Sequence, residues 1–393
     1  METLGEILSS DKYSIKRGPF GSALKKSFFV EKGIRIFEQY NPINNDPHWK
    51  RYFISHEKFQ ELEAFKATEG DLLISCSGTL GKIVELPKDT EMGIINQALL
   101  KIRLNNIKIL NSYFIYYFNS PIMQEKILES TLGSAIKNIA SVKILKQIEI
   151  PLPPLKEQER IVGILDESFA KIDESIKILE QDLLNLDELM QSALQKAFNP
   201  LKDNAKENYK LPQSWEWKSL EEISENISAG GDKPKNCTES KTAKNQIPVY
   251  ANGVNNNGLV GYTDKATIIK PSLTISARGT IGFVCIRKEP YFPIVRLISL
   301  IPCENILCLH YLYFCLNFFI AKGEGSSIPQ LTIPKFKSLQ IPLPPLKEQE
   351  QIAKHLDFVF EKAKALKELY TKELKDYEEL KQSLLDKAFK GEL

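Results

Sequence analysis

The decapeptide IPLPPLKEQE occurs twice in the chain, at residues 150–159 and again at residues 341–350. Shifting the sequence by 191 positions aligns residues 150–198 with residues 341–389 without a gap, and 24 of the 49 positions are then identical. Weaker similarities precede both copies in the same order, for example LLISCSGTLGK in the first half and LTISARGTIGF in the second. A repeat of this length indicates a tandem duplication in which a globular and a helical segment alternate twice.

Each copy of the repeat predicts a long helix that needs a partner. Proline suits the first turn of a helix, and after PLPP no further proline occurs until Pro200 in the first copy. Apolar residues then recur with the three-and-four spacing of a coiled-coil seam, which cannot remain exposed in water. The seam consists of Leu165, Phe169, Ile172, Ile176, Leu179 and Leu183 in the first copy, and of Leu356, Phe360, Tyr370 and Leu374 in the second. Lys367 occupies one seam position of the second copy.

The predicted fold class is α+β. Two globular α+β domains are joined by two long helices that pair as an antiparallel coiled coil, with pseudo-two-fold symmetry from the tandem duplication. The pairing is antiparallel because the first helix ends at the second globular domain, where the second helix begins. The expected domains are residues 1–150 and 206–340, and the expected helical regions are residues 151–205 and 341–393. With 393 residues the chain exceeds the roughly 250 at which a single core stops growing.

Within the globular domains, alternating apolar residues interrupted by glycine predict β-hairpins. The clearest are GDLLISCSGTLGKIVEL in the first domain and PSLTISARGTIGFVCIR in the second, and IPVYANGVNNNGLVGYTD indicates a strand, a polar loop and a strand. The segments YFIYYFN and YLYFCLN predict short buried helices.

Charge is distributed by module. Residues 1–147 carry 20 basic and 16 acidic side chains, and residues 203–338 carry 16 and 12. The two helical repeats carry 6 basic against 11 acidic side chains and 10 against 11. Basic domains on an acidic connector suit contact with phosphates at two separated points. Solvated lysine faces would produce the same totals, and charge alone favours that explanation over contact with phosphates.

Several loops combine the side chains that proteins use to contact DNA. In the first domain, basic and aromatic side chains alternate along the loops. In the second domain, amide side chains could pair with adenine edges and an arginine could pair with guanine. For any single residue of these loops, turn chemistry is the favoured explanation. The candidate DNA-binding residues are Lys16, Arg17, Lys25, Lys26, Trp49, Lys50, Arg51, Asn252, Asn255, Asn256 and Arg278.

No catalytic or metal-binding motif is present in the sequence. The GTLGK segment differs from a phosphate-binding loop in its glycine spacing, and Ile83 occupies the place of the required serine or threonine. The chain lacks HExxH, GxSxG and the Asn/Asp-Pro-Pro-aromatic tetrapeptide of amino-methyltransferases. Its six cysteines form no CxxC pair, which favours reduced core thiols. We expect no catalytic residues, no metal site and no cofactor in this chain.

The sequence favours a cytoplasmic protein without membrane contact. Acidic residues precede any apolar run in METLGEILSS, unlike in a secretory signal. The most apolar stretch, residues 306–321, is too short to span a bilayer and contains His310 and Asn317.

The segments IPLPPLKEQERIVGILD and IPLPPLKEQEQIAKHLD resemble the conserved helical regions of specificity (S) subunits of type I restriction-modification systems. The globular domains, with GDLLIS, SGTLGK and SWEWKSLEEI, resemble the target recognition domains of the same family. The resemblance covers essentially the whole chain in the right order. The doubled PLPPLxEQ before a heptad helix is its most specific part.

This resemblance implies a non-catalytic subunit that recognises double-stranded DNA. Each globular domain would read one half of a bipartite, asymmetric site through the major groove, and the helices would set the spacing and dock two methyltransferase (M) subunits. Restriction (R) subunits would join that core. S-adenosylmethionine, ATP and Mg²⁺ are then expected on the partner subunits. A non-specific DNA-binding coiled-coil adaptor is the alternative, but its two globular domains should be similar, and these differ strongly outside the shared framework.

Overall fold

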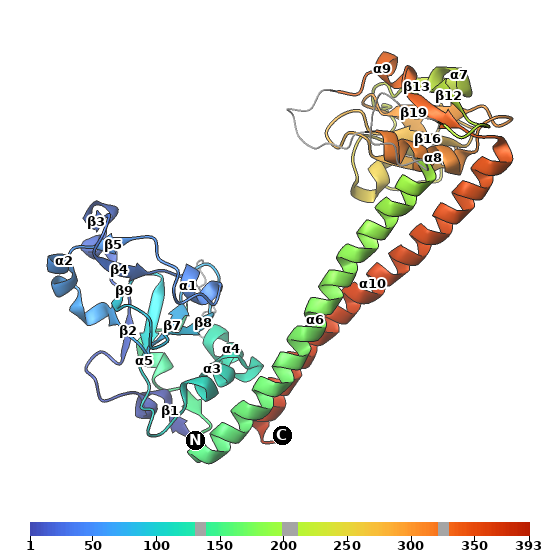
Figure 1. Cartoon of the computed structure of the whole chain (residues 1–393). Coiled ribbons are helices and arrows are strands. Elements are labelled where there is room, and N and C mark those ends of the chain that lie inside the picture. Colours follow the sequence, from blue (N-terminus) through green and yellow to red (C-terminus); the bar gives the residue numbers. More distant parts are fainter. Residues whose placement is uncertain (130–138, 199–210, 321–329) are drawn as a thin grey trace. The chain divides into compact units, whose positions relative to one another are not determined.

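The computed structural model describes residues 1–129, 139–198, 211–320 and 330–393 (Figure 1). They form two compact units, one of residues 1–179 with 372–393 and the other of residues 180–371. Each unit combines a globular head with a stretch of both long helices, α6 (Leu155–Phe198) and α10 (Leu346–Lys390). We call the globular parts head 1 (residues 1–150) and head 2 (residues 211–343).

Head 1 contains a four-stranded antiparallel sheet in the order β2-β10-β7-β8 and a five-stranded sheet in the order β3-β5-β4-β9-β6. A two-stranded ribbon, β1-β11, joins its two ends. The strands are β1 (Glu2–Thr3), β2 (Ile15–Arg17), β3 (Phe29–Val30), β4 (Ile34–Phe37), β5 (Phe53–Ile54), β6 (Lys66–Ala67), β7 (Leu72–Ser75), β8 (Ile83–Glu85), β9 (Gly93–Ile95), β10 (Leu99–Ile102) and β11 (Glu149–Ile150). The helices are α1 (Tyr40–Ile43), α2 (His56–Glu61), α3 (Asn111–Asn119), α4 (Pro121–Glu129) and α5 (Val142–Leu145).

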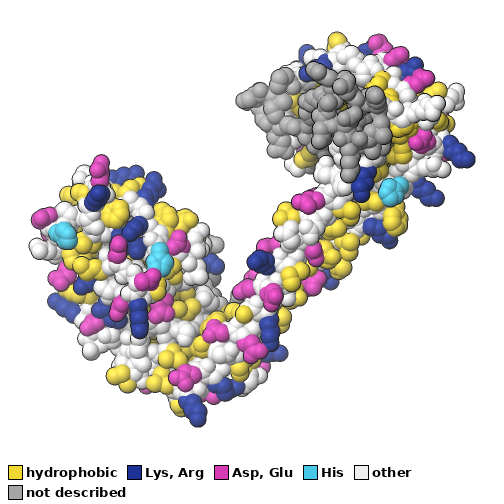
Figure 2. All heavy atoms as spheres, viewed as in Figure 1, with side chains coloured by type: hydrophobic (Ala, Val, Ile, Leu, Met, Phe, Trp, Pro, Cys, Tyr) yellow, Lys and Arg dark blue, Asp and Glu magenta, His cyan; other side chains and the backbone are white. Residues whose placement is uncertain are grey.

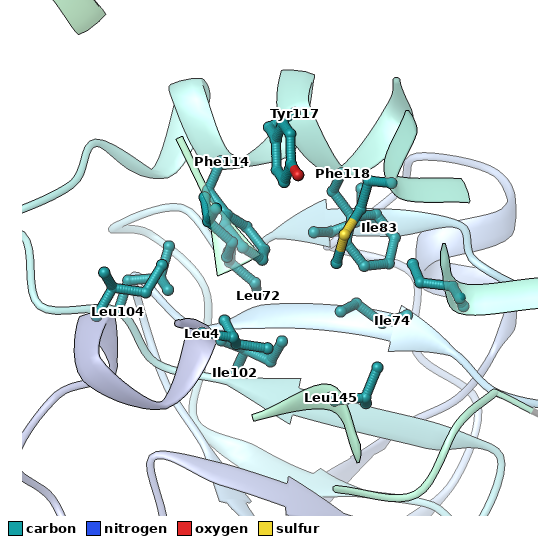
Figure 3. Close-up of a cluster of buried hydrophobic side chains, with 14 of the residues drawn as sticks. Leu4, Leu72, Ile74, Ile83, Ile102, Leu104, Phe114, Tyr117, Phe118 and Leu145 are labelled. Carbon is teal, nitrogen blue, oxygen red and sulfur yellow. The ribbon is translucent and has the colours of Figure 1, made fainter. Parts of the chain in front are cut away.

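The core of head 1 forms where α3 covers the four-stranded sheet. The aromatic side chains of α3, among them Phe114 and Tyr117, lie over the apolar residues Leu72, Ile74 and Ile83 of the sheet (Figure 3). All of these residues are buried, and burial of this kind contributes about 1.5–3 kcal/mol per large apolar side chain. Burial also raises the pKa of Tyr117 to about 12. The predicted short buried helix is therefore confirmed.

Head 2 repeats this framework. Its central sheet has the order β13-β19-β16-β17, equivalent to β2-β10-β7-β8 of head 1, and α8 packs on it as α3 does in head 1. The strands are β12 (Glu216–Ser219), β13 (Ser224–Ala229), β14 (Ile247–Tyr250), β15 (Leu259–Thr263), β16 (Ser272–Ile275), β17 (Val284–Arg287), β18 (Phe292–Pro293), β19 (Ile298–Pro302) and β20 (Gln340–Leu343). The helices are α7 (Leu220–Ile223), α8 (Leu309–Phe319) and α9 (Ile333–Lys337).

The heads differ in their second sheets. Head 1 adds the five-stranded sheet, whereas head 2 adds a three-stranded sheet in the order β15-β14-β18. The predicted hairpins are present in both heads, since β7 pairs antiparallel with β8, β16 with β17 and β14 with β15. Duplication thus preserved the central sheet and its covering helix, while the rest of each head diverged.

Within each unit the two long helices pack antiparallel. In the first unit Asp173 of α6 forms an ion pair with Lys381 of α10 at 2.5 Å, and in the second Asp187 forms one with Lys367. From the first pair to the second, α6 advances by fourteen residues while α10 goes back by fourteen, as antiparallel helices require. The heptad-spaced seam residues Leu165, Ile172 and Leu179, and Leu186 one heptad further along α6, are all at most 8% exposed. The predicted coiled coil is confirmed, and the seam position of Lys367 is filled by an ion pair.

The repeated decapeptide anchors each helix to its own head. The side chain of Gln158 is fully buried, accepts a hydrogen bond from the Leu110 backbone N–H at 2.9 Å and donates to the Lys108 and Pro153 carbonyls. Gln349 makes the equivalent three bonds in head 2, to Cys308 N–H and to the Ile306 and Pro344 carbonyls. A buried amide with both ends satisfied is costly to replace, so the identity of these residues has a structural cause.

Within the described part of the chain, no helix combines the length and apolar character needed to cross a membrane. The six cysteines are free thiols. Burial raises the pKa of Cys76 to about 11 and that of Cys315 well above its ordinary value, so these two thiols resist ionisation.

Candidate nucleic-acid interface

The two heads share one exposed turn at the end of the central hairpin. In head 1 the Ser75 N–H donates to the Lys82 carbonyl and the Gly81 N–H returns to the Ser75 carbonyl, at 2.9 and 3.0 Å. In head 2 the N–H groups of Ser276 and Gly282 make the same bonds. Gly81 and Gly282 have φ of 68° and 80°, which only glycine adopts without strain. The backbone of this turn is therefore the same in both heads, and the equivalent position carries Ser77 in head 1 and Arg278 in head 2.

Head 2 brings one of its three amide candidates, Asn252, into contact with this turn. Asn252 accepts a hydrogen bond from the Ala277 N–H at 2.8 Å and donates to the Val295 carbonyl at 2.6 Å, so its side chain joins three loops. Asn255 and Asn256 are exposed on the loop that connects β14 and β15. Arg287 stabilises that loop, because its guanidinium donates a hydrogen bond to the Asn257 carbonyl. The guanidinium carbon also lies 3.5 Å from the centroid of the Tyr250 ring.

Arg278 lines a cavity of about 390 Å³ beside the same turn. A second arginine, Arg296, lines this cavity as well, and no acidic residue is among the described residues that line it. Sequence reasoning missed Arg296, because the segment PIVRLISL carries only the apolar pattern of a buried strand. No local signal could have placed Arg296 beside Arg278.

In head 1 two candidates lie on the central sheet. Lys16 and Arg17 belong to its edge strand β2, where Arg17 pairs with Leu100 of β10. The Lys16 ammonium lies over the Tyr13 ring at 5.5 Å, and the Arg17 guanidinium lies over the Phe20 ring at 5.6 Å. Basic groups flanked by aromatic rings suit nucleic acid because they combine charge with stacking surface.

The remaining candidates of head 1 belong to the second sheet. Trp49 stacks on Tyr40 with ring centroids 4.3 Å apart, and its backbone carbonyl accepts from Arg35 and Asn41. Arg35 is 3% exposed, and burial lowers its pKa, so its role is to hold the loop. Four candidates remain. Lys25 and Lys26 are exposed on the segment before β3. Lys50 forms an ion pair with Glu91 at 3.1 Å, and the Arg51 guanidinium lies over the Tyr52 ring.

A partly buried ionic network lies beside the central sheet of head 1. Arg103 donates to both carboxylate oxygens of Asp71, which is fully buried, and to Asp11 at 2.7 Å. The bonds to Asp71 raise the pKa of Arg103, and the bond from Arg103 lowers the pKa of Asp11. Lys101 beside them is 2% exposed, and burial lowers its pKa. Arg103 is thus engaged within the fold, which makes this cluster a stabilising element.

The surface of head 1 carries mixed charge. On the face drawn in Figure 2, dark-blue basic and magenta acidic side chains are interspersed over head 1. Among the described residues, no group of three His, Cys, Asp or Glu side chains could hold a metal ion. What the loops offer is recognition chemistry: donors, amides and rings on a rigid framework.

The coiled-coil candidates lie between the helices. Within the described residues, all ten seam candidates of α6 and α10 are buried or half-buried. Other apolar residues of the helices face outward, among them Leu189 and Leu380, which are 52% and 44% exposed. These two leucines correspond to each other under the 191-residue shift.

The comparisons with known proteins agree with this architecture. A family model described as the type I restriction modification DNA specificity domain matches twice, over residues 21–183 and 212–375. Two type I specificity subunits of Mycoplasma pneumoniae are 33% identical over 221 residues and 31% identical over 231 residues. These matches cover 55% and 57% of this chain, and they span only 56% and 66% of the length of those relatives.

A solved structure concerned with complex assembly and conformational transition of the type I R-M system contains a chain with the same fold. The TM-score is 0.80 at 20% sequence identity, and the match covers 100% of this chain and 97% of that one.

Proposed function

We propose, because this chain belongs to the type I restriction-modification DNA specificity domain family, that it is a specificity subunit that selects a bipartite DNA site. On this proposal the chain supplies specificity and carries no catalysis of its own. Head 1 and head 2 act as target recognition domains, and each reads one half of an asymmetric double-stranded site through the major groove.

The observation that carries this proposal is one framework with two sets of loops. Both heads keep the central sheet order and the turn at the end of the central hairpin. They present different side chains from that turn, Ser77 in one and Arg278 in the other, and their second sheets differ in size. A protein that only had to hold DNA would gain nothing from two different heads, whereas two different half-sites require them.

The two repeated helices offer equivalent surfaces on which two copies of one partner protein could dock. Burial explains identities such as Gln158 and Gln349, but Leu189 and Leu380 are identical and exposed. An exposed leucine in the same place of both repeats offers the same apolar contact twice. Two methyltransferase subunits are the partners this supports, with restriction subunits joining them. S-adenosylmethionine, ATP and Mg²⁺ would be bound by those partners.

The test is site selection from random DNA by the chain co-expressed with its methyltransferase subunits. We expect an asymmetric site of two short half-sites separated by a gap of fixed length. The isolated chain should transfer no methyl group from S-adenosylmethionine to DNA. Binding without any sequence preference would instead support the non-specific coiled-coil adaptor, and methyl transfer by the isolated chain would contradict a non-catalytic subunit.

A further inference from the structure

One corner of head 2 combines a cavity, two arginines and a strained backbone. We call it the arginine corner. It lies where the end of β13, the β16–β17 turn and the segment before β19 meet the start of α9. Its lining includes Ala229, Gly230, Ala277, Arg278, Arg296 and Ile298.

The backbone that presents Arg296 is held in an unfavourable conformation. Val295 and Arg296 have φ of 54° and 59°, in the left-handed region that a β-branched residue such as valine rarely adopts. The Val295 N–H donates to the Gly231 carbonyl and the Arg296 N–H to the Gly230 carbonyl, both at 2.8 Å. Two consecutive residues in this region persist only when the surroundings hold them, and such strain concentrates at functional sites.

Comparison with head 1 shows which residue makes this conformation possible. In head 1 the Cys76 N–H of the shared turn donates to the Ala98 carbonyl at 2.8 Å. In head 2 the equivalent Ala277 N–H donates to the Asn252 side chain at the same distance. Asn252 therefore accepts the hydrogen bond that the Ala98 carbonyl accepts in head 1, and its amide also donates to the Val295 carbonyl. The segment before β19 is released from the turn and can take the left-handed path.

The two heads distribute arginines differently at this corner. Strand register makes the positions equivalent, because Leu100 pairs with Arg17 and Ile74 in head 1 as Ile298 pairs with Ala229 and Ile275 in head 2. The equivalent pairs are Arg17 and Ala229, Ser77 and Arg278, and Ala98 and Arg296. Head 1 thus has one arginine on the sheet edge, and head 2 has two arginines on the two turns.

We infer that Arg278 and Arg296 are the residues with which head 2 reads guanine in its half-site, and that Asn252 positions Arg296 for this contact. The inference rests on the proposed function. A guanidinium offers five N–H donors and no acceptor. Among the base edges in the major groove, only guanine presents two acceptors, O6 and N7, without a donor or a methyl group. Arg278 and Arg296, on the two turns around the cavity, each offer the donors that the O6 and N7 acceptors of guanine require.

The test is site selection by the chain with its methyltransferase partner, comparing the unchanged complex with Arg278→Ala and Arg296→Ala. Each substitution should lower the preference for guanine at a position of one half-site by roughly 5- to 140-fold, the range for losing a bidentate pair. The other half-site should keep its bases. Lys288→Ala is the matched control, because Lys288 is exposed at the opposite end of the β16–β17 hairpin from the turn.

Arg278→Lys separates base reading from phosphate contact. Lysine keeps the charge but lacks the planar fork, so guanine preference should fall while the salt dependence of binding stays the same. An even loss of affinity over all sequences, with lysine restoring it, would show a phosphate contact and overturn the inference while leaving the proposed function intact. Absence of sequence preference in the unchanged complex would overturn both.

Asn252→Ala tests the positioning role. The variant should lose guanine preference at the same base as Arg296→Ala, and the double variant should lose no more than Arg296→Ala alone, because both changes remove one contact. A merely structural effect of Asn252 would lower the melting temperature and leave the base preference unchanged, which would contradict its positioning role.

Discussion

Asp187 on α6 forms an ion pair with Lys367 on α10 at the position where the apolar seam of α10 is interrupted. The Lys367 side chain is 29% exposed and that of Asp187 is 61% exposed, so water reaches the pair. An ion pair of this kind contributes only about 0–1 kcal/mol. The equivalent position of α6 is Ile176, an ordinary seam residue. Compared with isoleucine at this seam position, Lys367 makes less apolar contact and adds only a weak ion pair.

Lys367→Ile should therefore stabilise the helix pair. Extending the apolar seam should raise the free energy of unfolding by about 1 kcal/mol, because the buried apolar surface outweighs the lost ion pair. Thermal unfolding followed by circular dichroism measures this change. Lys364→Ile, whose side chain is 80% exposed in the native chain, is the control and should give no gain. A lower melting temperature for Lys367→Ile would show that the ion pair is the stronger contribution.

The buried glutamines predict a large effect from a small substitution. Gln158→Ala should lower the free energy of unfolding by about 2–4 kcal/mol, because it removes three hydrogen bonds and leaves a buried N–H and two carbonyls without partners. Gln349→Ala should do the same in head 2. The neighbouring exposed residue provides the control, since Glu159→Ala should stay within about 0.5 kcal/mol. Equal melting temperatures for Gln158→Ala and Glu159→Ala would refute the anchoring role.

The ionic network of head 1 predicts acid sensitivity. The hydrogen bond from Arg103 holds the pKa of Asp11 below its ordinary value, so the unfolded chain binds this proton more readily than the folded chain. The stabilisation is present above the ordinary pKa of about 3.9 and is lost as the pH falls through the lower folded value. Melting temperatures between pH 2 and 6 should fall less steeply for Asp11→Asn than for the unchanged chain. Asp376→Asn, at an exposed position of α10, should keep the original slope.

The strained backbone before β19 predicts a stabilising glycine. Val295 is 50% exposed and has φ of 54°, so Val295→Gly removes strain while losing little burial. We expect a gain of about 1 kcal/mol in the free energy of unfolding. Val30→Gly is the matched control, because Val30 is 41% exposed in strand β3, where it pairs with Phe53 and glycine should cost about 1 kcal/mol. A loss of stability in both variants would mean that the left-handed turn is not strained.

The helix register predicts how the proposed spacer can be lengthened. The pair Asp187 and Lys367 places the bond after Leu183 opposite the bond after Tyr370. One heptad inserted at each of these two points should lengthen the helix pair by about 10 Å and keep the seam in register. The complex should then prefer a gap about three base pairs longer, at about 3.4 Å per pair, while reading the same bases. An unchanged gap preference in a folded complex would show that the helices do not set the spacing.

Much of this architecture could be predicted because its signals are local. Heptad spacing needs only the residues of one helix, and the start of α6 follows from a proline that suits a first helical turn. The hairpin turns follow from Gly81 and Gly282, because only glycine enters the left-handed conformation freely. Duplication repeated each signal in the second half of the chain, which is why the hairpins, the coiled coil and the two-head organisation were predicted correctly.

The tertiary structure decided what depends on residues far apart in the chain. Asn252 suggested base contact in the sequence, yet its side chain is engaged by Ala277 and Val295. Arg296 looked like part of an apolar strand, and Lys367 looked like a defect in the seam until Asp187 was placed opposite, 180 residues earlier. Hydrogen bonds and ion pairs of this kind depend on which segments of the backbone approach each other in the fold. The spacing of residues along the sequence carries no information about that approach. The sequence by itself therefore determined the hairpins, the long helices and their order, whereas only packing decided which polar side chains serve the fold and which face outward to a ligand.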